Sequence, residues 1–509
     1  MKTTFRVSRN YPKILRNRKR RIEQRLGRRA WKDQPDPMMG GGNIHYELSE
    51  KIGATSYGGM GAMHTMVKGL GLVEEINQGL QLLKVHLPYH ESDHVLNIAY
   101  NIRSGGERLE DIERRRQDES FLNGLGVQRL PDPTTAGDFT RRFSVQDITT
   151  LQECINRTRQ RAWQGQPEGF LAEAFIDVDG TIAGTYGECK GGMALSYQGI
   201  WGYGPLVVSL ANTREVLYLV NRSANVASHQ DSVSWIDRAI GLVKSVAGRI
   251  TLRGDTDFTH TAQLDRWDEG QVGFILGMDA HPKVVALAQG LSEQSWRALE
   301  RLPKYEILTE PRGRRERVKE QIVVQKGYLN QKLVAEHVSD MTYQPEKCQQ
   351  KYRLVVLRKN LSVQKGERVL FDEVRYFFYL TNRWDLSVEE IVGLANGRCD
   401  QENVIEQLKN GVNAMRMPVD DLVSNWAYMV MAALAWNLKA WYGLLAPDRE
   451  RGLELVRMEF RRFLHAIILL PVQIIRAGRR IVYRLLGYNS WLKDFFATWQ
   501  RLQKLQLVE

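Results

Sequence analysis

Hydrophobic positions recur with a helical period over much of the chain between residues 57 and 163. Met63, Val67 and Leu70 lie three or four residues apart, and the apolar stretch 95–102 follows Ser92, a residue type that caps helices. A further amphipathic stretch covers residues 143–163. Several of these segments are rich in arginine, so we predict a helical DNA-binding domain over residues 43–168, although solvated helix faces have the same composition.

Near Phe170 the hydrophobic pattern changes from helical to strand-like. Residues 175–181 alternate and then turn, and the segments 205–210, 215–220, 249–253 and 272–276 are further predicted strands. A helix is predicted at residues 232–247, between the third and fourth of these strands. Strands interleaved with a helix indicate a mixed α/β core, whose first part we place at residues 169–284.

Residues 285–374 are charged and prone to form strands, with candidates at 305–308, 321–324, 352–357 and 368–371. Because so long a segment is unusual for a loop, we predict an inserted β-rich subdomain. The core then resumes at the apolar run 376–380 and continues to residue 440. Ser387 and Glu390 have the spacing of a capping box that opens a helix. Residues 441–509 are predicted to form a C-terminal helical region.

The net charge of +12 is concentrated at one end of the chain. Residues 1–32 contain 13 Lys and Arg against one acidic residue, which leaves 58 basic and 58 acidic residues elsewhere. An arm with Arg18, Lys19, Arg20 and Arg21 suits binding to a phosphate backbone, while a solubilising tail or targeting peptide is the alternative. Residues 35–42 have the composition of a linker, so we delimit a basic arm and linker at 1–42.

Cysteine, histidine and apolar patterns narrow the class of protein. The four cysteines lie far apart without zinc-site spacing, which favours reduced thiols in a cytoplasmic protein. His86, His90 and His94 recur every four residues, but Pro88 interrupts any helix there, so we do not expect a histidine metal site. The longest apolar run, residues 426–438, is too short to span a bilayer.

Two aspartates end predicted strands, and a glutamate lies on a predicted helix. Asp179 begins an Asp-Gly-Thr turn and Asp255 lies in Gly-Asp-Thr, at strand ends where α/β sheets place catalytic groups. Aspartate is also common in ordinary turns, so neither is specific alone. If one helix continues from Arg398, then Glu402 and Lys409 lie about 40° and 20° around it, on a single polar stripe. An exposed charged helix has the same pattern.

The spacing Arg398-x3-Glu402-x6-Lys409 resembles the R-x3-E-x6-K signature of insertion-sequence DDE transposases. The Asp-Gly-Thr turn and the Gly-Asp-Thr-x-Phe258 turn resemble the segments around the first and second aspartates of that family. Similar stretches at 101–118, 130–143, 437–438 and 476–480 extend the resemblance over nearly the whole chain. It is strongest to the bacterial insertion-sequence group thirteen-eighty. Ala395 stands where the family usually has Tyr, and Gly397 favours a kink before the motif.

The resemblance implies an RNase H-like mixed sheet with a β-rich insertion, flanked by N-terminal and C-terminal helical regions. It implies a nucleoid-associated endonuclease that binds terminal inverted repeats, cuts and joins DNA, and assembles as a homodimer in a synaptic complex. Two Mg²⁺ or Mn²⁺ ions about 4 Å apart serve such chemistry. Asp179 would bridge both ions, and Asp255 and Glu402 would bind one each. Arg398 and Lys409 would contact DNA phosphates.

Several alternatives remain open from the sequence. Asp177 faces the same side of its strand as Asp179 and is a rival first ligand. Trp296 in the insertion could stack on a flipped base at a transposon end, although aromatic residues are more often part of a core. The protein could also be a catalytically decayed DNA-binding relative, or a metal-dependent nuclease without strand transfer.

Overall fold

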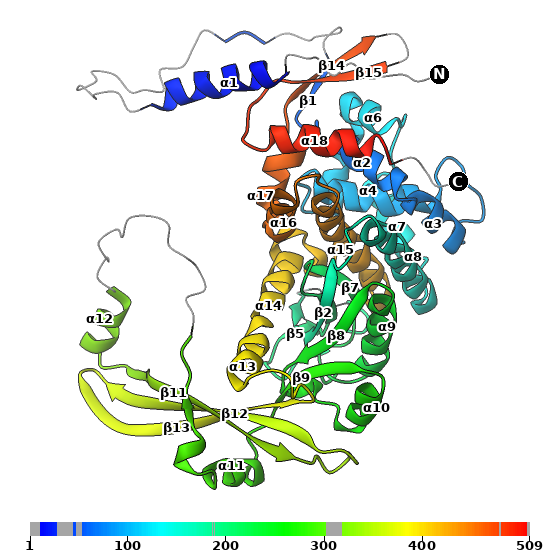
Figure 1. The fold of residues 1–509 in the computed structure, drawn as a ribbon. Coiled ribbons are helices and arrows are strands. Elements are labelled where there is room, and N and C mark those ends of the chain that lie inside the picture. The colour runs from blue at the N-terminus through cyan, green and yellow to red at the C-terminus, as the bar shows by residue number, and fades with distance from the viewer. Residues whose placement is uncertain are drawn as a thin grey trace. The chain divides into compact units, whose positions relative to one another are not determined.

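A computed structural model describes residues 11–27, 44–46, 53–185, 187, 189–301, 318–477 and 480–505. The chain forms two compact units: the first contains Met1–Gln166, Thr185–Met193 and Glu406–Glu509, and the second contains Pro167–Gly184 and Ala194–Ile405 (Figure 1). The linker expected at 35–42 and the strand expected at 305–308 lie outside the described residues.

The framework of the second unit is a nine-stranded mixed sheet with the strand order β10-β11-β12-β13-β9-β8-β2-β6-β7 (Figure 1). Its strands are β2 (Leu171–Gly180), β6 (Leu206–Leu210), β7 (Glu215–Val220), β8 (Ala247–Gly254), β9 (Val272–Met278), β10 (Arg297–Ala298), β11 (Leu329–Tyr343), β12 (Tyr352–Lys365) and β13 (Arg368–Thr381). The three central strands β2, β8 and β9 are parallel, and the other neighbours are antiparallel. The predicted mixed α/β core is confirmed.

The sequence of each central strand explains its place in the sheet. Every residue of β6 and β7 is buried, as expected for apolar runs covered on both faces. Helix α9 (Ser232–Lys244) connects β7 to β8 and packs against the strands. Since β2 and β8 are parallel and Asp177 lies opposite Arg253, the two strands end at the same edge of the sheet. That edge carries Asp179 and Asp255.

The β-rich insertion extends the central sheet, because β13 pairs antiparallel with β9. The segments predicted at 368–371 and 376–380 belong to one continuous strand, β13. The prediction of a strand at 321–324 is wrong, because these residues lie in helix α12 (Val318–Gln325). Lys319, Glu320 and Gln321 favour a helix, and Gly327 follows it with a positive φ of 63°.

The first unit is mostly helical, as predicted for its N-terminal part. Its helices are α1 (Tyr11–Leu26), α2 (Met60–Gly69), α3 (Leu72–Gly79), α4 (Glu91–Arg103), α5 (Ile112–Arg116), α6 (Glu119–Leu125), α7 (Pro133–Thr140), α8 (Val145–Gln164), α15 (Leu422–Leu444), α16 (Arg449–Arg457), α17 (Phe460–Phe463) and α18 (Leu492–Leu502). Helix α15 is buried almost throughout and packs against α4, α8 and α16. The prediction assigns residues 375–440, and with them most of α15, to the catalytic core, whereas α15 lies in the first unit.

The C-terminal region is not entirely helical, which corrects the prediction for residues 441–509. Strands β14 (Val472–Ala477) and β15 (Arg480–Leu485) form a hairpin, and β14 also pairs with β1 (Gly53–Thr55). The hairpin sequence is rich in β-branched valine and isoleucine, which favour strands when a partner strand is available. Strand β15 provides such a partner next to β14, whereas the second partner, β1, lies more than 400 residues earlier in the chain, so no local pattern reveals that pairing.

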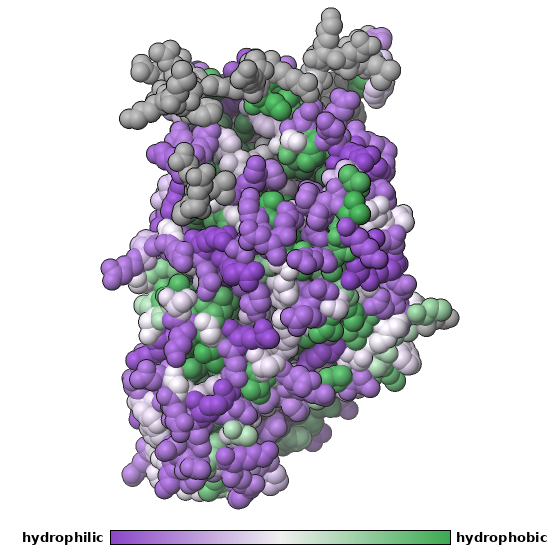
Figure 2. All heavy atoms as spheres, turned by 90° about the vertical axis from the view of Figure 1, so that its right-hand side faces the viewer, coloured by the Kyte–Doolittle hydropathy of each residue, from purple (hydrophilic) through white to green (hydrophobic). Residues whose placement is uncertain are grey.

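Hydrophilic residues cover most of the face drawn in Figure 2, with hydrophobic residues interspersed. No helix among the described residues is long and apolar enough to cross a membrane. All four cysteines are free thiols, and Cys189 and Cys399 are exposed.

Candidate active site

Asp179 and Asp255 lie at neighbouring strand ends of the second unit. Asp179 is the penultimate residue of β2, and Asp255 directly follows β8. The Asp255 carboxylate accepts the backbone N–H of Asp257 at 3.0 Å and so caps a short 3₁₀ turn. Phe258 in that turn is buried, and a Cβ at Gly254 would lie 2.9 Å from the Phe258 Cβ. The Gly-Asp-Thr-x-Phe segment therefore needs glycine for a tight turn that aims Asp255 at the sheet edge.

Arg398 connects the two aspartates. Its Nη1 lies 3.1 Å from Asp179 Oδ2 and 4.0 Å from Asp255 Oδ2. The Asp179 side chain is 17% exposed and that of Asp255 is 36% exposed, so the carboxylates are reachable from solvent although largely covered. One guanidinium thus faces two acidic groups.

Burial dominates the acidity of both carboxyl groups. Burial raises the pKa of Asp179 to about 6, the negative charge of Asp255 adds to this rise, and Arg398 opposes it. Burial likewise raises the pKa of Asp255, again against the influence of Arg398. The protein therefore does not fully compensate two negative charges at this edge, and an additional cation would stabilise their ionised forms.

Glu402 lies on a helix that is docked against the strand carrying Asp179. The helical segment consists of α13 (Val388–Gly397) and α14 (Cys399–Glu406), with a break at Arg398. Glu402 is exposed and follows Arg398 by four residues, about one helical turn. The neighbouring Gln401 side chain donates to the carbonyls of Asp177 at 3.1 Å and Val207 at 3.0 Å. Val207 is in turn the β6 partner of Asp179.

The three carboxylates do not form a preassembled cluster. Among the described residues, the one group of three His, Cys, Asp or Glu side chains with ligand atoms all within 4.8 Å is His86, His90 and Glu91 in the first unit. Asp179 and Asp255 share a partner in Arg398, and Glu402 belongs to the helix that begins beside them.

Asp177 has a different environment from Asp179. It is 1% exposed, and both of its oxygens are bound by the Arg253 guanidinium at 2.7 and 2.8 Å. Arg253 Nη1 also donates to the carbonyl of Leu394 in α13 at 3.0 Å. The arrangement favours Asp179 over Asp177 as a ligand, and it makes Arg253 a tie between β2, β8 and α13.

The two departures from the family motif have local explanations. A Cβ at Gly397 would lie 2.8 Å from Arg253 Nη1, so the glycine leaves room for the buried guanidinium. Ala395 packs against the hydrophobic cluster that includes Ile275, Val355 and Ile391. The helix therefore has an apolar contact at the position where the family usually has tyrosine.

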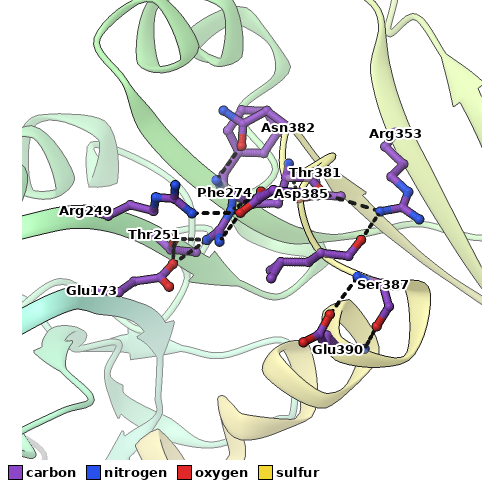
Figure 3. Close-up of polar contacts among 12 residues, drawn as sticks. Glu173, Arg249, Thr251, Phe274, Arg353, Thr381, Asn382, Asp385, Ser387 and Glu390 are labelled. Atoms are coloured by element: carbon purple, nitrogen blue, oxygen red, sulfur yellow. Dashed lines mark hydrogen bonds and ion pairs between the residues drawn. The ribbon is translucent and has the colours of Figure 1, made fainter.

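The start of α13 is held by a polar network at the other end of the strands (Figure 3). Ser387 and Glu390 form the predicted capping box, with backbone-to-side-chain hydrogen bonds of 2.7 and 3.1 Å. In the preceding loop, Asp385 accepts from Arg249 on β8 at 2.8 Å, and Asn382 accepts from the backbone of Phe274 on β9 at 2.9 Å. The helix is thus fixed to the sheet before it reaches the aspartates.

The helix does not continue regularly to Lys409. Residues Gln407–Gly411 form a π-helical turn, and residues from Glu406 onward belong to the first unit. The angle of about 20° computed for Lys409 assumed an uninterrupted α-helix and does not hold. The turn is locally stabilised where the Gln407 side chain accepts the backbone N–H of Phe460 at 2.9 Å.

The predicted DNA-contacting residues outside this edge differ in exposure. In α1, the Arg18 guanidinium donates to the carbonyls of Leu485 and Gly487 at 2.8 and 2.9 Å. Lys19 pairs with Glu23, and Arg20 and Arg21 are exposed. Trp296 is half-buried, with the Arg358 guanidinium 4.3 Å from its ring centroid. One face of the indole is therefore covered by a cation.

Comparison with known proteins identifies a family and solved structures that are similar to the chain. The family model described as Transposase DDE domain group 1 matches residues 52–507. No curated protein sequence matches the chain. A chain in the cryo-EM structure of a piggyBac transposase synaptic complex with hairpin DNA is similar, with 11% identity, a TM-score of 0.35, and coverage of 82% of this chain and 84% of that chain.

Proposed function

The chain belongs to the DDE transposase family, and from this premise we propose that it binds the terminal inverted repeats of a mobile element, cleaves DNA there and transfers the strand to a target. The observation that best supports the proposal is the shared contact of Asp179 and Asp255 with Arg398, at the start of the helix that carries Glu402. The proposed catalytic residues are Asp179, Asp255 and Glu402.

The residues at this edge fit divalent Mg²⁺ or Mn²⁺. Carboxylate oxygens are the hard ligands that these ions prefer, and burial has raised the pKa of both aspartates. The Arg398 guanidinium occupies the space where positive charge is needed. Two ions, when bound, would supply activation of the nucleophile, stabilisation of the leaving oxygen and neutralisation of the phosphate. Asp179, Asp255 and Glu402 would hold these ions.

The basic residues would bind and orient the DNA. The Arg398 fork would pair with a phosphate, and Lys409 would add a point charge. The exposed Arg20 and Arg21, together with Lys19, would attract the DNA backbone irrespective of its sequence. Arg18 would contribute indirectly, because its hydrogen bonds hold α1 to the loop after β15.

The finer assignments are also proposals. We propose an RNase H-like core, supported by the order β7-β6-β2-β8-β9 with antiparallel pairs on one side of β2 and parallel pairs on the other. A basic arm at 1–42 and a DNA-binding domain at 43–168 would precede it, and Trp296 in the insertion would stack on a base. A bacterial element of group thirteen-eighty, a homodimer in the synaptic complex and a nucleoid-associated location complete the proposal.

The experiment uses purified full-length protein, Mg²⁺, and DNA carrying the sequences that flank its gene. Joined products are the expected result. Nicks without joining would indicate a nuclease, and bound but intact DNA would indicate a catalytically decayed relative. Asp255→Asn should abolish both nicked and joined products. Asp257→Asn should retain them, because the Asp257 side chain is exposed and its hydrogen bond to Asp255 is donated by the backbone N–H.

A further inference from the structure

We propose that His86, His90 and Glu91 bind a divalent transition-metal ion, with Zn²⁺ as the best-suited probe. The three residues lie in the first unit, where the loop after α3 enters α4, and each offers a ligand atom within 4.8 Å of the others. The site is separate from the carboxylates of the second unit, and its existence does not depend on the proposed function.

Glu91 supplies a buried and firmly held carboxylate. It is 1% exposed, and its Oε1 accepts the backbone N–H groups of Leu82 and Leu83, each at 3.0 Å. A carboxylate as deeply buried as this one is unfavourable as an anion unless a positive charge compensates it.

The protein offers no permanent cation to this anion within the described residues. The ion pair found for Glu91 is with His86, whose Nε2 lies 3.1 Å from Oε2. In the part of the chain that the structure describes, no lysine or arginine pairs with Glu91. A divalent ion bound at Oε2 would supply the missing charge, and Oε1 would keep its two hydrogen bonds.

The two histidines are placed to complete the coordination. Their rings stack with centroids 4.3 Å apart, and the His86 side chain is 45% exposed. Exposure gives an ion a path to the site and lets each ring turn its nitrogen toward a common centre. Neutral imidazole nitrogen is a frequent ligand for such metals.

His94 is not part of this group, although the four-residue spacing suggested it. Its ring is buried and stacks on Phe139 at 4.3 Å, and burial lowers the pKa of His94 to about 4. The third ligand is Glu91, the first residue of α4, which the spacing of histidines does not reveal. Pro88 led us to expect no histidine metal site on a helix. The proposed site instead uses the loop before α4 and the first residue of that helix.

The chemistry of the ligands selects the class of metal. Two imidazoles and one carboxylate suit Zn²⁺ and neighbouring transition ions, whereas Mg²⁺ prefers oxygen ligands and retained water. Three protein ligands leave a position for water. Bound there, the ion would join the loop containing Leu82, Leu83 and His86 to the start of α4, and would stabilise the folded state by linkage.

The test uses the full chain after chelation. Excess Mg²⁺ is present to occupy the carboxylates of the second unit, so that they do not contribute to the binding signal. Zn²⁺ is titrated by calorimetry, and Co²⁺ is titrated with visible absorption as a readout of coordination geometry. His86→Ala and His90→Ala are compared with His45→Ala, which removes an exposed histidine elsewhere in the first unit. All three changed side chains are exposed, so the variants should fold.

We expect one tightly bound ion in the unmodified protein and in His45→Ala. His86→Ala and His90→Ala should weaken binding by more than about tenfold, because even partners outside the coordination sphere change affinity by that factor. Zn²⁺ should also raise the melting temperature of the unmodified protein and of His45→Ala, but not that of His86→Ala or His90→Ala. No stoichiometric binding, or equal binding by all three variants, would overturn the site.

Discussion

Arg253 connects three elements of the candidate site. It lies on β8 before Asp255, and it binds β2, which carries Asp179, and α13, which precedes Glu402. It pairs with Asp177 on β2, donates to Leu394 on α13, and lies with its guanidinium 5.0 Å from the ring centroid of Phe175. The side chains of Arg253 and Asp177 are 6% and 1% exposed. Because its hydrogen bonds go to Asp177 and to the Leu394 carbonyl, we regard Arg253 as a positioning residue.

Arg253→Met should lower the free energy of unfolding by about 3–5 kcal/mol, since it leaves the Asp177 charge buried and unpaired. Arg249→Gln on the same strand is the matched control. It removes an ion pair to Asp385 whose side chains are 51% and 48% exposed, and such pairs contribute about 1 kcal/mol or less. Urea unfolding at neutral pH measures both, and equal losses would contradict the role of Arg253.

The raised pKa of Asp179 predicts a pH dependence of stability in metal-free protein. In the folded state this carboxyl has a pKa of about 6 against an ordinary 3.8, so between these values the folded state binds more protons than the unfolded chain. The free energy of unfolding therefore rises as the pH falls from 7 through 6 toward 4. Ionised Asp179 correspondingly destabilises the metal-free fold at neutral pH.

Asp179→Asn should therefore stabilise metal-free protein at pH 7.5 by on the order of 1 kcal/mol, with the loss of the Arg398 contact reducing the gain. Below pH 4 the difference should disappear, because the native carboxyl is then protonated as well. Chemical unfolding in the presence of a chelator at both pH values provides the measurement. A variant that is less stable at pH 7.5 would show that the ion pair with Arg398 outweighs burial.

At the scale of elements, two glycines of α13 give a matched pair of substitutions. Gly393 is exposed and an added Cβ there contacts nothing within 4 Å, so Gly393→Ala should stabilise the protein by about 0.5–1 kcal/mol. Gly397→Ala introduces a Cβ 2.8 Å from Arg253 Nη1 and should displace the guanidinium or the helix. We expect it to lose stability and to lower DNA cleavage, while Gly393→Ala leaves cleavage unchanged. Similar gains from both substitutions would contradict the close approach.

Elements were predictable where the local pattern agreed with the final packing. The alternation and the buried runs of β2, β6, β7, β8 and β9 were visible in the sequence, as was the capping box of Ser387. The pairing of β14 with β1 and the π-helical turn at Gln407 were not, because each depends on a distant partner. Helix α12 was missed because its central Ile-Val-Val run resembles a strand.

For the candidate site, too, the residues with a local sequence signal differ from those whose contacts are distant in the sequence. Asp179, Asp255 and Glu402 are proposed from strand ends and from the resemblance of their motifs, and their role stays a prediction. Arg253 and Gln401 were missed, because their partners lie 76 and 224 residues away in the sequence. Both are polar residues inside otherwise apolar packing, and a buried arginine beside a predicted catalytic strand end is the signal that could have been used.

At the scale of the whole molecule, the charge excess of the arm predicts a salt-dependent contribution to DNA binding. Arg20→Gln should reduce the slope of log affinity against log salt by about 0.9, the value for one phosphate contact. Arg18→Gln should change the slope less and instead lower the melting temperature, because Arg18 is bound to the carbonyls of Leu485 and Gly487. Fluorescence anisotropy over a range of salt concentrations distinguishes them. Equal changes in slope would mean that Arg18 also contacts DNA.

Glu402 tests the central claim most directly, because the structure ties it to the two aspartates only through its helix. Glu402→Gln should retain DNA binding and lose cleavage of a transposon-end substrate in Mg²⁺. Glu406→Gln removes the charge of an exposed glutamate in the same helix and should retain both DNA binding and cleavage. Cleavage and binding of the two variants are measured side by side on the same DNA. Cleavage by Glu402→Gln at the level of Glu406→Gln would contradict a single site formed by Asp179, Asp255 and Glu402.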